Sequence, residues 1–293
     1  MTVLADIASV IAPLFVIAGI GFAWGRSGRA FDTGMIGALT INLGVPCLIF
    51  STLTKLQVSP EAFGHMAGAF ALAVAGNMVV GAVLLRAMRL DVAGFLPTVV
   101  FANNGNMGLP LCLFAFGDAG LALGICAFVI SSVGNFTLGI GLVSGKLSVR
   151  DVLKNPYIYV IGAALVFMVT GAKPPRWIAN TTEIVGGMSI PLMLVALGVS
   201  LSRLKVQSLS RSLILAVMRI GTGFLMGVGI SWALGFEGAA RGVLILQCSM
   251  PTAVINYIIA ERFNRHAGEV AGVIVTSTLI VFAALPLLLY VVM

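Results

Sequence analysis

Residues 94–117 read "GFLPTVVFANNGNMGLPLCLFAFG", an apolar run long enough to cross a membrane with a polar stretch at its middle. The polar part, "NNGNMGLP" at residues 103–110, places three carboxamides, two glycines and a proline in eight positions. At about 1.5 Å per residue, each apolar flank covers about half of a ~30 Å hydrocarbon core. The interruption is therefore predicted to lie near the centre of a bilayer.

The composition of the whole chain is that of an integral membrane protein. Of its 293 residues, 59% are hydrophobic and 9% are charged, and the mean hydropathy is +1.10. Soluble domains carry about 25% charged residues. The net charge of +7 reflects membrane topology rather than a nucleic-acid partner. The four cysteines lie inside apolar runs without a CxxC pair, so we expect small core residues and no metal or cofactor.

Apolar runs of spanning length predict an all-α membrane protein with ten transmembrane helices. Met1 to Trp24 is expected to be a retained helix, because it lacks the basic start of a signal peptide. The runs cover residues 3–25, 34–54, 62–85, 93–117, 120–144, 156–172, 180–200, 212–234, 239–260 and 269–292.

Lys and Arg alternate in number between successive loops. Twelve fall on one side and four on the other, with Arg219 left inside a helix. The positive-inside rule places the richer side in the cytoplasm, so both termini are expected on the non-cytoplasmic side of an inner (plasma) membrane.

The two halves of the chain resemble each other. "PLFVIAG" from Pro13 resembles "PYIYVIG" from Pro156, and "VPCLIF" with Pro46 resembles "IPLMLV" with Pro191, at offsets of 143 and 145 residues. A repeat of five helices enters the membrane from the opposite face in its second copy, which is typical of secondary transporters. We predict a first repeat at 1–145, a short cytoplasmic linker at 146–155 and an inverted second repeat at 156–293.

A second interruption, "LQCSMPTAVINY" at residues 246–257, falls at the matching position of the second half. Non-helical backbone at this depth is tolerated where it lines a cavity or is buried in protein. Pro110 and Pro251 are suited to begin the second half-helices, whose positive dipole ends favour an anion. A kink whose asparagines only satisfy freed backbone groups is the alternative. The predicted substrate-binding residues are Asn103, Asn104, Gly105, Asn106, Gly108, Pro110, Ser249, Met250, Pro251, Thr252, Asn256 and Asn135.

All ten acidic residues fall in loops or near predicted helix ends. This distribution argues against a sodium/proton exchanger with a buried carboxylate pair. The lack of an HExxH motif and of two membrane aspartates argues against an intramembrane protease, so we expect no enzyme. Arg219 either attracts an anion or extends to the cytoplasmic edge. Glu261 either forms an ion pair with Arg262 or Arg265 or contacts a gate. Gln247 and Asn135 are helix-packing residues or ligands.

At these residues the chain resembles the auxin efflux carrier family and looks like a bacterial PIN-like transporter. The resemblance rests on Asn103, Gly108 and Pro110, on "MPTAVINYIIAERF" from Met250, on "KNP" from Lys154 and on "IPLMLVALG" from Ile190. It implies crossing broken helices 4 and 9, a scaffold of helices 1, 2, 6 and 7, and an elevator-like moving part of helices 3–5 and 8–10. The short linker differs from the long loop of plant carriers, which indicates a minimal carrier whose substrate need not be auxin.

We therefore predict a secondary transporter of small organic anions, auxin-like or mono- and dicarboxylates, with the lipid bilayer as its other partner. A sodium-coupled symporter resembling bile acid sodium carriers is the first alternative, and an anion-binding receptor or channel is the second. Sodium or proton coupling and a homodimeric assembly are both compatible with the sequence.

Overall fold

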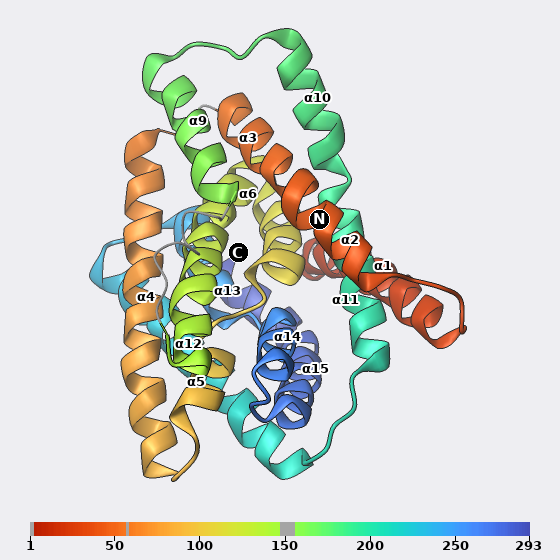
Figure 1. The fold of residues 1–293 in the computed structure, drawn as a ribbon. Helices are drawn as coiled ribbons and strands as arrows, with labels where there is room; N and C mark the ends of the chain where they lie inside the picture. The colour runs from red at the N-terminus through yellow and green to blue at the C-terminus, as the bar shows by residue number, and fades with distance from the viewer. Residues whose placement is uncertain (1–2, 57–58, 147–155) are drawn as a thin grey trace.

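The computed structural model describes residues 3–56, 59–146 and 156–293, which form helices joined by short loops (Figure 1). Residues 147–155, most of the predicted linker including Arg150 and Lys154, lie outside the described residues. The helices are α1 (Val3–Arg26), α2 (Thr33–Leu39), α3 (Val45–Leu56), α4 (Pro60–Ala87), α5 (Val92–Val100), α6 (Leu109–Gly134), α7 (Ile140–Ser144), α9 (Pro156–Thr170), α10 (Arg176–Gly187), α11 (Ser189–Arg203), α12 (Leu209–Ala233), α13 (Gly238–Ser249), α14 (Ile255–Arg262) and α15 (Ala267–Val292).

The prediction of an all-α integral membrane protein is confirmed. By length and hydropathy, seven stretches of the described residues could cross a membrane. Each of the ten predicted runs contains helical residues, but three differences reduce the ten runs to seven stretches. Residues 104–144 form one stretch that Gly117 bends at a φ of +64°, α9 has only 15 residues, and run 239–260 is split into α13 and α14.

Runs 34–54 and 180–200 contain a local irregularity, as does run 120–144 with its π-helical turn at Asn135–Gly139. Run 34–54 consists of α2 and α3 with a π-helical turn at Thr40–Gly44 between them. Run 180–200 consists of α10 and α11, which meet at Met188. Pro46 and Pro191, the prolines that relate the two halves in sequence, each lie in the first turn of the helix after such an irregularity.

The helices pack in two groups. In the first group α1 lies closely along α11, and α3 packs against both α9 and α10. In the second, α12 packs against α4, α13 and α15, and α6 packs against α4 and α13. Figure 1 shows α4 along one side of the molecule and α10 and α11 along the opposite side. The close approach of α1 to α11 requires Gly198, where a Cβ atom would overlap the backbone of Ala18.

Each of the two sides that the charge count distinguishes carries an ion pair between distant parts of the chain. Lys55 pairs with Glu183 at 2.7 Å on the side with few basic residues. On the richer side, Arg265 and His266 both contact Asp91, at 3.3 and 3.2 Å. Burial alone would raise the pKa of Asp91, but the Gly94 amide, His266 and Arg265 together lower it.

Candidate functional site

The two interruptions cross each other inside the second group of helices. Ala102, after α5, and Thr252, after α13, pair as a short antiparallel bridge. The backbone amide of Asn103 donates to the Pro251 carbonyl at 2.7 Å. Each unwound segment therefore satisfies part of the backbone of the other, which allows non-helical chain at this depth.

The first interruption is shorter than its sequence suggests. The Asn103 side chain accepts a hydrogen bond from the Asn106 amide at 3.2 Å and so caps a π-helical turn at Asn104–Gly108. Helical backbone therefore resumes at Asn104, and Pro110 lies in the first turn of α6 as predicted. Pro251 does not begin α14, because it lies in the unwound link four residues before that helix.

Side chains from the second interruption satisfy the carbonyl end of α5. Asn256 donates from Nδ2 to the carbonyls of Pro97 and Phe101, at 3.2 and 3.1 Å. The Thr252 hydroxyl donates to the Thr98 carbonyl at 2.9 Å. Both residues are almost fully buried. Asn256 and Thr252 thus hold the crossing together through their side chains.

Gln247, on α13, joins the first interruption to α6. Asn104 donates from Nδ2 to the Gln247 side-chain and backbone oxygens, at 2.6 and 2.7 Å. The Gln247 amide donates in turn to the Gly124 carbonyl at 3.4 Å. Gly108 leaves room for this contact, since a Cβ atom there would overlap the Gln247 carboxamide. This geometry matches the helix-packing role that an isolated polar residue in an apolar run indicates.

Three buried side-chain atoms at the crossing have no hydrogen-bond partner among the described residues: Asn103 Nδ2, Asn104 Oδ1 and Asn135 Oδ1. The Gly105 amide likewise donates to none of the residues that the structure describes. Asn106 is partly exposed beside it. An unpaired buried polar group costs about 1–3 kcal/mol. Such a cluster is favourable where a ligand or water completes its hydrogen bonds.

The partners of these carboxamides decide which atoms are left free. Both Nδ2 donors of Asn256 serve carbonyl groups, so its Oδ1 accepts from Asn135 Nδ2 at 2.9 Å. Asn135 therefore keeps a free oxygen. In the same way Asn104 keeps a free oxygen, and Asn103 keeps a free NH₂ group. The crossing offers both acceptors and donors.

The other predicted residues lie at the same crossing. The Ser249 hydroxyl donates to Ile245 within α13, and Met250 is fully buried. A Cβ atom at Gly105 would lie 2.9 Å from the Phe128 ring of α6 and 3.8 Å from Met193 of α11, so Gly105 lies between the two groups of helices.

For two charged residues the structure contradicts one of the two sequence-based alternatives. Arg219 does not extend to the membrane edge: it is 1% exposed and donates to the backbone of both interrupted helices. Glu261 accepts a hydrogen bond from the Tyr257 hydroxyl at 2.7 Å, and within the described chain no ion pair joins it to Arg262 or Arg265.

Comparison with known proteins identifies the family. The profile of a family described as "Membrane transport protein" matches residues 140–291, just over half of the chain. The chain belongs to this family. It is the auxin efflux carrier group that the sequence resembles, so that prediction is confirmed.

Relatives of this membrane transport family align over most of the chain. An uncharacterized transporter of Methanothermobacter thermautotrophicus is 25% identical, with 87% of this chain and 88% of the relative covered. A protein of Rhizobium meliloti named provisionally as a malonate transporter is 21% identical, with 98% and 96% covered. The family and the names of these relatives establish the chain as a membrane transporter.

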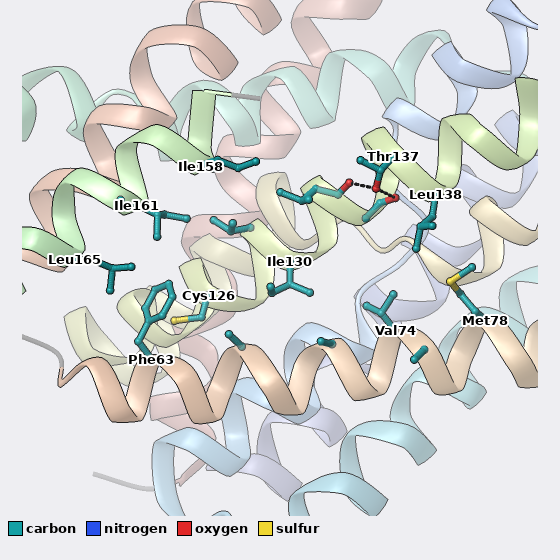
Figure 2. Close-up of a pocket in the computed structure, with 17 residues that line it drawn as sticks. Phe63, Val74, Met78, Cys126, Ile130, Thr137, Leu138, Ile158, Ile161 and Leu165 are labelled. Carbon is teal, nitrogen blue, oxygen red and sulfur yellow. Dashed lines mark hydrogen bonds between the residues drawn. The ribbon is translucent and has the colours of Figure 1, made fainter. Parts of the chain in front are cut away.

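A separate groove of about 640 Å³ lies between α4, α6 and α9 in this membrane transport protein (Figure 2). Its walls are apolar side chains such as Phe63, Ile130 and Ile161. The Thr137 hydroxyl in the wall already donates to the Val133 carbonyl at 2.6 Å. A carboxylate would lose its hydration there without gaining donors. The crossing, although more enclosed, is therefore the better candidate for an anion site.

Proposed function

We propose that the chain is a secondary transporter that carries small organic anions by an elevator-type alternating-access mechanism. The observation that carries the proposal is the crossing itself, where two interrupted helices meet and leave buried polar atoms unpaired. Two second half-helices, α6 and α14, also begin there, and their positive dipole ends favour an anion. The proposal includes no catalytic role.

Within the crossing we assign substrate contact to the Asn103 NH₂ group, the Gly105 amide and the Asn106 side chain. These groups have free donors or partial exposure, whereas Asn256, Thr252 and Asn135 are engaged in holding the two interruptions together. The provisional name of the Rhizobium relative makes mono- and dicarboxylates, malonate among them, the first substrates to test.

The proposed architecture is ten spans in two inverted five-helix repeats, with both termini on the non-cytoplasmic side of an inner membrane. The packing of helices supports it, because exchange of the repeats converts the contact of α1 with α11 into the contact of α9 with α3. The matching interruptions at α5–α6 and α13–α14 also follow this exchange.

The elevator division has its own support. We assign α1–α3 and α9–α11 to the scaffold and the other helices to the moving part. The long-range side-chain hydrogen bonds and ion pairs described above all join two residues of the same group, as in Asn104–Gln247 and Lys55–Glu183. The apolar groove between α4, α6 and α9 lies along the boundary between the groups. An apolar boundary can slide without the loss of hydrogen bonds.

The test is flux of labelled malonate into liposomes that contain the purified protein. We expect uptake by the unaltered chain and a loss of about tenfold or more for Asn103→Ala and for Pro110→Ala, because both changes act on the crossing. Uptake that both substitutions leave unchanged would contradict the assignment of the site. Counterflow separates a carrier from a receptor or channel, since only a carrier lets unlabelled substrate drive labelled substrate uphill.

A sodium-coupled symporter is the second candidate, and one observation favours it. The unpaired oxygens of Asn104 and Asn135 are the kind of neutral ligand that a hard cation accepts. Uptake that is the same with choline in place of sodium would exclude this mechanism, and proton coupling would then be tested with a pH gradient. A homodimer, the assembly that we propose, would be checked by mass measurement in detergent.

A further inference from the structure

Arg219 is a buried cation that touches both interrupted helices. Its Nη1 atom donates to the Val99 carbonyl at 3.1 Å, and its Nη2 atom donates to the Cys248 carbonyl at 2.7 Å. Val99 lies at the end of α5, and Cys248 lies at the end of α13. The guanidinium therefore bridges the carbonyl ends of the two first half-helices.

The surface of α12 beside Arg219 allows this contact. Gly223 lies one turn after Arg219 on α12, and a Cβ atom there would overlap the Cys248 carbonyl oxygen. Because α12 approaches α13 closely at this glycine, Arg219 reaches the backbone rather than solvent. Among the residues that the structure describes, no carboxylate lies within ion-pair distance of Arg219, and its Nε atom has no hydrogen-bond partner.

The charges of the helix ends and of Arg219 at the crossing can be summed. Each helix end carries about half an elementary charge, negative at the carbonyl end and positive at the amide end. The ends of α5 and α13 contribute about one negative charge, which Arg219 balances. The amide ends of α14 and of the helical segment that begins at Asn104 and continues into α6 then remain as about one positive charge. Without Arg219, the four helix ends would sum to about zero.

We propose that Arg219 is the positioning residue that gives the crossing its net positive charge and so selects ligands by their negative charge. This inference rests on the proposed transport of organic anions and extends it to charge selectivity. Arg219 acts through the ends of α5 and α13, and the substrate contacts remain those assigned above.

The experiment compares two ligands of similar shape and different charge, malonate and its half-amide malonamate, by calorimetric binding to the purified full-length protein. The attraction between Arg219 and a ligand scales with the charge of the ligand. For Arg219→Met we expect affinity to fall about tenfold for the dianion and about threefold for the monoanion. Arg219→Lys keeps the charge and should stay within about twofold for both. Arg241→Gln, a change at an exposed arginine on α13, is the matched control and should also stay within about twofold.

If Arg219→Met and Arg219→Lys lose affinity for malonate and for malonamate to the same extent, Arg219 has a packing role and the proposal is overturned. Unchanged binding in Arg219→Met would overturn it as well. If that variant does not fold, the unaltered protein decides: at low salt it should bind malonate several-fold more tightly than malonamate, and equal affinities refute charge selection. If the unaltered protein binds no organic anion, the proposed function fails, and this inference fails with it.

Discussion

Asn256 is the side chain whose removal should cost the crossing most. It makes three buried hydrogen bonds, to Pro97, Phe101 and Asn135, at 3.2, 3.1 and 2.9 Å. Inside membranes such bonds average about 0.6 kcal/mol each, so Asn256→Ala loses about 2 kcal/mol from the bonds alone. The Asn135 NH₂ group is also left unpaired, which adds about 1 kcal/mol or more. The expected loss in the free energy of unfolding is about 2–4 kcal/mol.

Unfolding by SDS in mixed micelles measures this loss, and Asn42→Ala is the matched control. The Asn42 side chain is exposed, and among the described residues it bonds only to the Ala38 carbonyl one turn earlier, so its loss should cost less than about 0.5 kcal/mol. A double-mutant cycle of Asn135→Ala with Asn256→Ala should show a coupling of about 1 kcal/mol. If Asn256→Ala is as stable as the control, or if the pair is strictly additive, the role assigned to Asn256 is wrong.

Two further predictions concern other parts of the chain. Gly198→Ala should destabilise the protein by about 1–3 kcal/mol, because the added methyl group meets the α1 backbone. The control is Gly19→Ala, which places a methyl group in open space on α1 and should be neutral or stabilising. Equal thermal midpoints of the two variants would contradict the tight packing of α1 on α11. Asp91 has a lowered pKa in the fold, so its contribution to stability is present at neutral pH and is lost as the pH falls through the acid range below about 4. Asp91→Asn should flatten the stability profile there, and an unchanged profile would argue against this ion-pair cluster.

The membrane class and the two interruptions could be predicted because they depend on local composition. A run of about 20 apolar residues is stable in a bilayer as a helix, and a polar, proline-containing stretch at its middle interrupts that helix wherever it occurs. The predicted extent of the break was less accurate. The cap that Asn103 places on the turn at Asn104–Gly108 depends on side-chain geometry, and composition does not reveal it.

The direction of the Arg219 side chain could not be predicted from the sequence for a related reason. An arginine about two turns into a helix can extend to the interface or turn inward, and both are compatible with its neighbours in the chain. Its position depends on Gly223 and on the ends of two other helices. The sequence feature that marks Arg219 is a positive charge inside a predicted helix, because the count of basic residues by loop assigns it to neither side of the membrane.

The sequence by itself determined that this chain is a membrane protein and that two of its helices are interrupted, because hydropathy, length and proline act over neighbouring residues. Only the tertiary structure decided how the polar groups at the crossing are used. Asn104 bonds to a residue 143 positions away, and Asn135 bonds to one 121 positions away. Whether a polar group is hydrogen-bonded within the protein or left free depends on these distant partners, and only the packing of the helices brings them together.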